Sequence, residues 1–335
     1  MTPKLLTAVR DDTPTRVVRV VSERALVYAH GAQPMLDLPA HVRAGSALAR
    51  TARWLIIVQD DTQSLGRYDL ESGRLTALAL PAGHNGARQF GEARGNKKHK
   101  RDFESAVFLP DLMGGTMLAF GSGSTPARRT VLVAQGLDSA PSIRECDATP
   151  LYEAFARAQG FCTSELNVEG VAHVGDSLWF FQRSNGQALG SETPRDAVCE
   201  VPLAQVLGAL DGDPREILPV NVRQIVLGEL DGVRLGITDA WSDDRGRVYF
   251  LAAAEDSPDA YHDGEIKGSA LGCIEPDERV WWVALTDRST GELLPIKAEG
   301  LVGTGPGAKT FSMVTDPDDP AIACTLYELV LEGEN

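Results

Sequence analysis

The sequence is poor in positive charge. Its 335 residues carry 32 Lys and Arg side chains against 47 Asp and Glu, so the formal net charge is −15. Proteins that bind nucleic acids in general use broad basic surfaces, because every phosphate of the backbone is negative. The charge balance therefore argues against a nucleic-acid partner.

Long hydrophobic runs are also missing. No apolar run approaches the roughly 18 residues that are needed to span a bilayer. The first residues, MTPKLLTAVRDDTPTRV, contain no apolar core of the kind found in a secretory signal. We therefore expect no membrane partner and a cytoplasmic location.

Cysteine is scarce and scattered. The five cysteines form no Cys-x-x-Cys pair and no Cys/His spacing typical of a metal site, which predicts buried structural thiols. They are Cys146, Cys162, Cys199, Cys273 and Cys324.

The chain does contain a repeat. Six short apolar runs, each followed by a small or polar cluster, recur about every 57 residues, and such periodicity is typical of repeat architectures. Their β-branched and aromatic residues, with turn formers after them, predict strands. The runs are ALVYAHG, WLIIVQDD, TMLAFGSGS, LWFFQRSN, VYFLAAAEDS and FSMVTDPDD.

A second predicted strand precedes four of these runs, and each copy carries one acidic residue. The copies span 102–109, 167–174, 236–243 and 298–305, and their acidic residues are Glu104, Glu169, Asp239 and Glu299. A third strand often follows the run. The unit is therefore an up-and-down antiparallel sheet.

This pattern predicts an all-β fold, a six-bladed β-propeller in a single domain over residues 1–335. A strand from 16–22 is expected to join the last blade and close the ring, which removes exposed sheet edges. A pair of β-sandwich domains is the alternative. Short helices are expected at 151–160 and 202–210. The predicted blades span 16–42, 43–95, 96–145, 160–225, 228–297 and 298–335.

The four acidic residues are expected to converge at one end of the propeller axis. Carboxylates packed this closely need a cation, basic partners or raised pKa values. A divalent metal, most plausibly Ca²⁺, satisfies them with oxygen ligands, and Asn167 with loop oxygens near Ser122, Asn185 and Asp316 would complete the shell. The alternatives are acidic residues that bond backbone N–H groups of a neighbouring blade, and a water-filled polar channel.

A dense basic cluster precedes the first acidic strand. We expect Lys97, Lys98, His99, Lys100 and Arg101 to lie at a rim and to bind an anionic group of a substrate, together with Arg183. His84 and His99 are candidate bases, and Arg88 a further anion contact. A solvated surface loop is the alternative.

The loop 254–272 crowds Asp256, Asp259, His262, Asp263 and Glu265 into one connector. Long loops in compact domains are usually functional. We expect it to cap one mouth of the channel, with solubility as the competing interpretation.

Several segments resemble known propellers. DFESAVFL, NVEGVAHVGDSLWFFQR, AEGL and MVTDPDDP are similar to sheet signatures of bacterial phytase-like and esterase-like propellers. FLAAAEDSPDAYHDGEIKGSALG resembles a narrower, uncharacterised bacterial propeller family of unknown function. The resemblance implies six blades, often a channel metal, and sometimes hydrolysis of phosphoesters, esters or lactones.

In lactonase propellers, acidic and Asn side chains from inner strands hold one divalent ion. The resemblance therefore assigns Glu104, Glu169, Asp239 and Asn167 to such a set. The chain departs from the pattern because it has no secretion signal and no full phytase metal set.

These features favour a metal-dependent hydrolase of a small anionic phosphoester, ester or lactone. Glu104 or Glu169 would act as the base and the basic cluster would hold the anion. A noncatalytic propeller that binds a ligand or a protein partner is the alternative, because no nucleophile motif is found.

Overall fold

The computed structural model describes residues 3–13, 16–185, 193–213, 215–256, 264–287, 290–305, 307 and 309–333. The described part of the chain is built mainly from β-strands, with two α-helices. The predicted all-β class is confirmed. The predicted helices correspond to α1 (Thr149–Arg157) and α2 (Leu203–Leu210). None of the described helices is long and apolar enough to cross a membrane.

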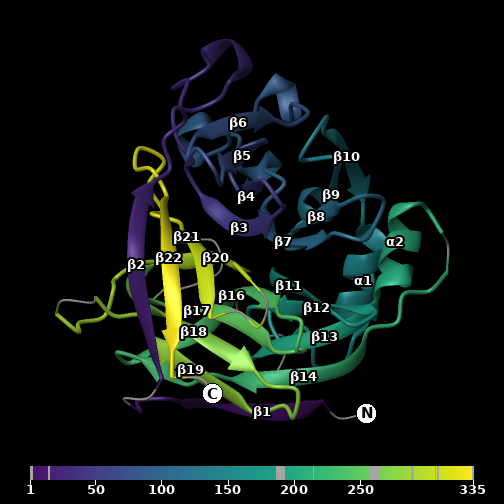
Figure 1. Ribbon diagram of the computed structural model, residues 1–335. Coiled ribbons are helices and arrows are strands. Elements are labelled where there is room, and N and C mark those ends of the chain that lie inside the picture. The colour runs from purple at the N-terminus through teal and green to yellow at the C-terminus, as the bar shows by residue number, and fades with distance from the viewer. Residues whose placement is uncertain are drawn as a thin grey trace.

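Most strands pair antiparallel in four-stranded units, each made from neighbouring segments of the chain (Figure 1). The first two units are β3 (Gly45–Arg50), β4 (Trp54–Gln59), β5 (Ser64–Asp69) and β6 (Leu75–Ala79), then β7 (Phe103–Leu109), β8 (Thr116–Gly121), β9 (Thr130–Gln135) and β10 (Ser142–Asp147). The next two are β11 (Val168–Val174), β12 (Ser177–Gln182), β13 (Asp196–Pro202) and β14 (Val220–Val226), then β16 (Val233–Ser242), β17 (Val248–Asp256), β18 (Glu265–Ile274) and β19 (Val280–Ala284).

The last unit combines both ends of the chain. It contains β20 (Ala298–Gly303), β21 (Thr310–Thr315), β22 (Thr325–Glu332) and, on its outer edge, β2 (Val17–Ala25). β2 pairs antiparallel with β22, from Val17 opposite Glu332 to Ala25 opposite Thr325. The strand predicted at 16–22 therefore does lie beside the last strands of the chain.

The described residues form five four-stranded units, not the six that the repeat predicts. The predicted first blade, 16–42, does not form a sheet of its own. Its strand β2 belongs to the last unit, and the run at 26–32 contains only an isolated bridge between Val27 and His41. The apolar run at 26–32 therefore has the sequence pattern of a blade strand but does not form one.

The first strands of the units contact one another in the order β3, β7, β11, β16 and β20, and β20 contacts β3. We call these five the inner strands; their labels lie around the middle of Figure 1. Four-stranded sheets placed radially in this way fit a β-propeller. A single domain over the whole chain stays a prediction.

The N-terminal strand β1 (Lys4–Arg10) joins two units. Lys4–Thr7 pair parallel with β14, and Ala8–Arg10 pair parallel with β19. A short strand, β15 (Glu229–Leu230), extends β16 on the other side. Together these pairings link two units into one ten-stranded sheet.

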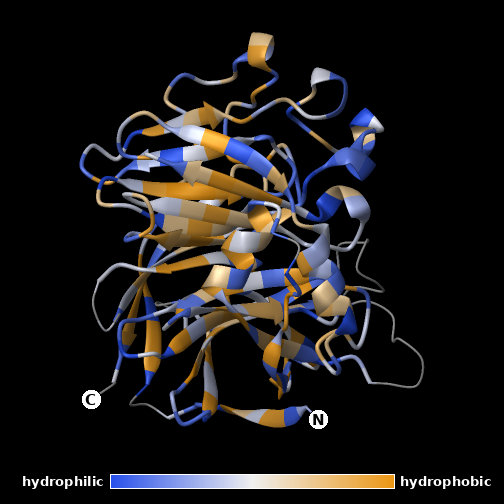
Figure 2. Ribbon diagram, turned by 90° about the vertical axis from the view of Figure 1, so that its right-hand side faces the viewer, coloured by the Kyte–Doolittle hydropathy of each residue, from blue (hydrophilic) through white to orange (hydrophobic). Residues whose placement is uncertain are grey.

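Apolar side chains from the second strand of each unit form much of the core. All six residues of β4 and of β8 are buried, because neighbouring units cover both faces of these strands. Figure 2 shows hydrophobic residues along the stacked strands and hydrophilic ones in many of the loops. All five cysteines are free thiols, and all but the partly exposed Cys162 are buried, which agrees with the predicted structural role.

Candidate functional site

The inner strands share a local irregularity. Where each pairs with the second strand of its unit, the register shifts by one residue. Such a bulge adds one unpaired residue and redirects its side chain. The bulged residues are Ser46, Glu104, Glu169, Thr238 and Glu299. Three of the four predicted acidic residues therefore occupy equivalent positions.

Asp239 is the exception, since it follows the bulged residue Thr238 by one position. Its side chain is fully buried. Its Oδ2 accepts a hydrogen bond of 2.7 Å from the backbone N–H of Leu301 on β20. This is the alternative role that the sequence left open, an acidic residue bonded to the backbone of a neighbouring blade. The predicted equivalence of Asp239 with the three glutamates is wrong.

The hydroxyl residues at bulges also connect neighbouring inner strands. The Ser46 hydroxyl donates to the carbonyl of Phe103 at 2.5 Å. The Thr238 hydroxyl donates to the carbonyl of Ala298 at 2.5 Å. The bulges without glutamate thus hold the ring together, while the other three place glutamates at its centre.

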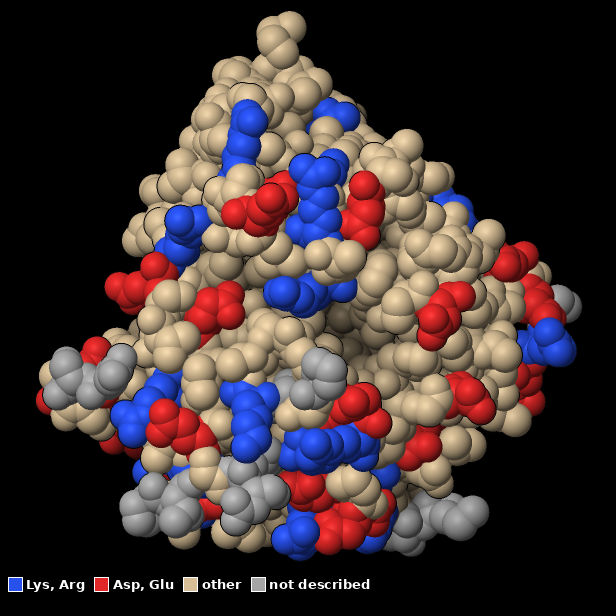
Figure 3. All heavy atoms as spheres, in the orientation of Figure 1, with Lys and Arg blue, Asp and Glu red and all other residues tan. Residues whose placement is uncertain are grey.

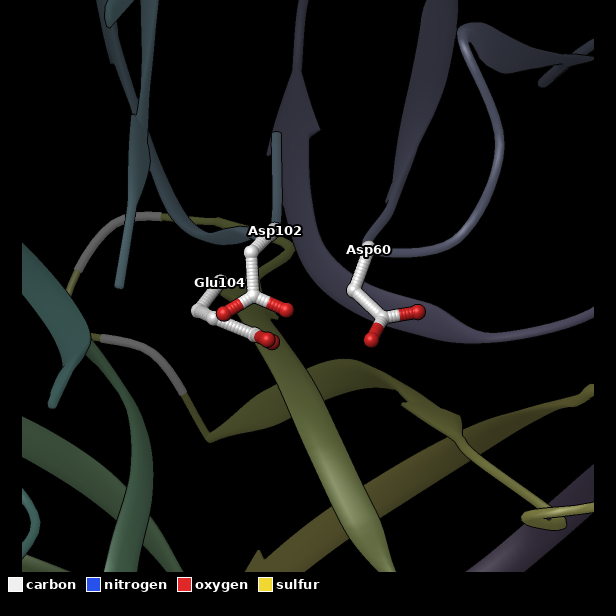
Figure 4. Close-up of side chains that lie close together, drawn as sticks. All are labelled: Asp60, Asp102 and Glu104. Carbon is white, nitrogen blue, oxygen red and sulfur yellow. The ribbon is translucent and has the colours of Figure 1, made fainter. Parts of the chain in front are cut away.

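Glu104 belongs to a compact group of three carboxylates that we call the acidic triad (Figure 4). Asp60 follows β4, and Asp102 and Glu104 lie at the start of β7. One carboxylate oxygen from each lies within 4.8 Å of the others. No sequence motif pointed to a role for Asp60 or Asp102. The only signal for Asp60 was its place directly after a predicted strand.

Basic and hydroxyl side chains surround Asp102. Lys100 forms ion pairs with Asp60 and, at 2.5 Å, with Oδ1 of Asp102. Oδ2 of Asp102 contacts Arg128 at 2.7 Å and accepts a hydrogen bond from the Ser122 hydroxyl at 2.5 Å. Burial alone would raise the pKa of Asp102, but these partners lower it to about 2. Asp102 therefore stays ionised.

Glu104 has the opposite electrostatic environment. Within the described ranges, no group donates a hydrogen bond to its carboxylate or forms a direct ion pair with it. Burial, followed by the charges of Asp102 and Asp60, raises its pKa well above the usual range. Without a bound metal ion, Glu104 thus favours its protonated form, although the charge of Lys100 opposes this.

Glu169 lies between an amide and a guanidinium. It accepts a hydrogen bond of 2.6 Å from Asn167, and its Oε1 is 3.8 Å from Arg183. Arg183 also contacts Glu255 at 2.9 Å. Burial raises the pKa of Glu169 despite the opposing charge of Arg183. Arg183, predicted as an anion contact, is thus already paired with two carboxylates.

Glu299 forms an ion pair with a neighbouring lysine. Lys297 lies 3.6 Å from Glu299 and 2.9 Å from Asp318. Burial raises the pKa of Glu299 well above its ordinary value, although Lys297 opposes this. The predicted need of the carboxylates for basic partners or raised pKa values is therefore met in both ways.

The predicted basic cluster separates in space. Lys100 reaches the acidic triad, whereas Arg101 pairs with Glu145 of β10 at 3.0 Å. Lys97 pairs with Glu92 at 3.1 Å. The rings of His99 and His84 stack with their centroids 3.8 Å apart. Arg88, predicted as a further anion contact, instead donates to the carbonyls of Leu80 and Leu36.

A pocket of about 590 Å³ opens beside the triad, and we call it the rim pocket. Asp60 and Lys100 line it, so the pocket and the triad share two residues. Asp61, in the same lining, pairs with Arg43 at 2.8 Å, yet burial and the charge of Asp60 raise its pKa to about 6. Figure 3, drawn from the same side as Figure 1, shows a hollow near the middle of the molecule, bordered by acidic and basic side chains.

Lys98 lines a separate space of about 510 Å³ together with Lys97 and Arg128.

The predicted cap is only partly described, because residues 257–263, including Asp259, His262 and Asp263, lie outside the described residues. Its role as a cap stays a prediction.

The triad fits a divalent cation by its donor chemistry. Oδ1 of Asp60 is buried and has no hydrogen-bond partner, and Glu104 is unpartnered in the described part of the chain. Hard cations such as Ca²⁺ and Mg²⁺ bind carboxylate oxygens of this kind. The predicted ligands Glu169, Asn167, Asp239 and Glu299 lie outside the triad.

Fold and site together describe a propeller-like protein with a densely charged centre. The chain belongs to the family of unknown function DUF6929, whose model matches residues 41–331. This agrees with the resemblance to an uncharacterised family. A comparison with curated protein sequences gave no match.

Solved structures give only distant likenesses. Glutaminyl cyclase from Myxococcus xanthus is 12% identical, with 99% of this chain and 100% of that chain covered and a TM-score of 0.45. The PQQ-bound aldose sugar dehydrogenase from Streptomyces coelicolor is 12% identical, covering 95% and 98%, with a TM-score of 0.43. A gluconolactonase from Xanthomonas campestris is 11% identical, covering 96% and 99%, with a TM-score of 0.40. At these values no activity carries over to this chain.

Proposed function

We propose that the centre of the ring is a metal-dependent hydrolase site for a small anionic phosphoester, ester or lactone. The cation, Ca²⁺ in the first instance, would bind the acidic triad, and the substrate would occupy the rim pocket. The observation that supports this is the convergence of three carboxylates, with unpartnered oxygens on Asp60 and Glu104, beside a pocket that Asp60 also lines.

The charge balance supports a cation. Glu104, Glu169 and Glu299 all have raised pKa values, chiefly because of burial and partly because of neighbouring carboxylates. A divalent ion at the triad would lower the cost of ionising Glu104. When bound, such an ion polarises the scissile group and lowers the pKa of a bound water.

Different side chains have the proposed roles of metal ligand, base and anion contact. Asp60, Asp102 and Glu104 would hold the ion, so Glu169 is the candidate base. Asn167 donates a hydrogen bond to the carboxylate of Glu169 and orients it. Burial raises the pKa of Glu169, and a carboxylate with a raised pKa accepts a proton more readily. Lys97 and Arg43 line the rim pocket and would attract the anionic group.

The test combines cation binding with turnover. Ca²⁺, Mg²⁺, Mn²⁺ and Zn²⁺ are compared by thermal shift, and lactone, ester and phosphoester panels by activity. We expect Ca²⁺ to raise Tm in the wild type, D60N and E104Q to lose this response, and E169Q to bind Ca²⁺ but lose turnover. E145Q is the matched control, because Glu145 pairs with Arg101 outside the triad. No shift with any ion, with unchanged turnover in E169Q, would contradict the proposal.

A noncatalytic ligand-binding protein, or one that binds a protein partner, is the second candidate. The observation that favours it is Lys100, whose ammonium already neutralises part of the triad without a metal. Reproducible turnover of any lactone, ester or phosphoester would eliminate this candidate. For the hydrolase and for the ligand-binding protein we propose a small anionic ligand. For every candidate we propose no nucleic-acid partner and a cytoplasmic location.

A further inference from the structure

We propose that Lys100 is a built-in counter-ion of the acidic triad, which a divalent cation displaces into the rim pocket, where its ammonium then faces the anionic ligand. This inference rests on the cation site of the proposed function, but not on hydrolysis. It makes Lys100 the residue that couples cation binding to ligand binding.

The contacts of Asp102 show why the ammonium and a metal ion compete. Oδ2 of Asp102 is already taken by the Ser122 hydroxyl at 2.5 Å and by Arg128 at 2.7 Å. The remaining oxygen, Oδ1, contacts Lys100 at 2.5 Å. A metal ion can therefore bind Asp102 through Oδ1 only if the ammonium leaves.

The contacts of Asp60 also indicate that the Lys100 ammonium and a metal ion compete. Its Oδ2 pairs with Lys100, while its Oδ1 is buried without a hydrogen-bond partner. The ammonium thus satisfies one oxygen of each aspartate and does not pair with Glu104. Lys100 and Arg128 neutralise the two aspartates, and neither pairs with Glu104. A divalent ion with several oxygen ligands would satisfy all three carboxylates more fully.

The rim pocket can accommodate the displaced ammonium of Lys100. The lysine is 8% exposed, and it lines the rim pocket as well as contacting the triad. Because Lys100 already lines the pocket, rotation about its side-chain bonds can turn the ammonium toward it. A lysine stem has four flexible carbons, which permits such a movement. In the pocket the ammonium joins Lys97 and Arg43, where it can contact an anion.

The main experiment measures Ca²⁺ affinity by isothermal titration calorimetry at one pH in the wild type, K100M and K97M. Removal of the competitor should make K100M bind Ca²⁺ about tenfold more tightly, within the usual range for coupling between two ligands. K97M is the matched control, because Lys97 lies in the same rim segment and pairs with Glu92 instead of the triad. The inference is overturned if K100M binds no more tightly than K97M, or if no variant binds Ca²⁺.

A second measurement uses the wild type and does not depend on the folding of K100M. Brief acylation with an amine-reactive acetyl ester, followed by mass spectrometry, reports how accessible each lysine is. We expect saturating Ca²⁺ to raise acylation of Lys100 several-fold and to leave Lys97 unchanged. Equal acylation of Lys100 with and without Ca²⁺ would contradict displacement.

The two proposals fail in different ways. If K100M and K97M bind Ca²⁺ equally, the role of Lys100 is wrong while the cation site and hydrolysis stand. If K100M shows the gain in affinity but no ester, lactone or phosphoester is turned over, the hydrolase is wrong while the role of Lys100 stands.

Discussion

Asp102 and Glu104 lie two residues apart and have pKa values shifted in opposite directions. Both are affected by burial, which raises a carboxyl pKa. Asp102 has Lys100, Arg128 and the Ser122 hydroxyl as partners, and its pKa falls to about 2. Glu104 faces the charges of Asp102 and Asp60, and its pKa rises. Local partners, not the position on the ring, decide which carboxyl is ionised.

At the residue scale, D239N should change the pH dependence of stability. Burial raises the pKa of Asp239 well above its ordinary value, so the folded state holds this proton more tightly than the unfolded chain. Stability from this residue is present below the ordinary pKa and is lost as the pH rises toward the folded value. Asn cannot ionise, so the stability of D239N relative to the wild type should increase as the pH rises from 5 to 8.

Urea unfolding at both pH values measures this difference. The exposed residue Asp231 provides the control D231N. An identical pH profile in D239N and the wild type would show that Asp239 is not held in its neutral form.

At the element scale, the bulges place side chains and also bring the inner strands close together. Gly170 and Gly300 directly follow bulged glutamates. A Cβ at Gly300 would lie 2.8 Å from the backbone carbon of Ala47, on β3 of the next unit. The position after the bulge therefore needs a glycine here for steric reasons, because backbone atoms of two strands meet.

We expect G300A to lower the free energy of unfolding by about 1–3 kcal/mol, the usual cost of overpacking. Chemical denaturation measures the loss. G305A is the control, because a Cβ at Gly305 would meet no atom of the described residues within 4 Å. Equal stability of the two variants would mean that β20 and β3 can separate without cost.

The N-terminal strand gives a second prediction at this scale. Leu6 is 5% exposed and belongs to the core cluster of β14, β16 and β17, whereas the adjacent Leu5 is 49% exposed. L6A should destabilise the protein by about 2–4 kcal/mol, since it leaves a cavity. L5A should change stability by less than about 0.5 kcal/mol. Thermal unfolding of both variants is the measurement, and similar losses would show that β1 is not anchored by Leu6.

At the scale of the whole molecule, the centre of the ring contains many buried carboxyls with raised pKa values. They include Asp61, at about 6, and Glu104, Glu169, Asp239, Glu299 and Asp316. Burial is the largest cause in each case. Asp102 and Glu255 are shifted the other way by their basic partners. Carboxyls with lowered pKa values are already ionised in both the folded and the unfolded state above about pH 5, so only the raised group changes the stability between pH 5 and pH 8.

We therefore expect the metal-free protein to lose stability as the pH rises from 5 to 8. The contribution of Asp61 should disappear between about pH 4 and pH 6, from its ordinary to its folded pKa. Differential scanning calorimetry across this range, with a chelator present, measures the change in Tm. A Tm that rises steadily from pH 5 to pH 8 would contradict the account of the buried carboxyls.

The local pattern of residues was enough to predict much of the fold and part of the site. Short apolar runs with turn formers predicted strands that the structure contains, such as β4, β8 and β12. Glu104, Glu169 and Glu299 were correctly predicted to share a position. These features depend on neighbours in the sequence, where strand periodicity and turn chemistry act.

Only the tertiary structure decided the rest. The number of units depends on β2 pairing with β22, 300 or more residues away, and no local pattern specifies such a partner. Asp239 differs from the three glutamates because the bulge of β16 falls on Thr238, and composition does not indicate which residue of a strand is bulged. The acidic triad joins Asp60 to Asp102 and Glu104 across two units, with Lys100 between them. The sequence by itself determined strands, glutamates and an acidic charge balance, while three-dimensional packing decided which charges meet, because burial and ion pairing arise only between segments that folding brings together.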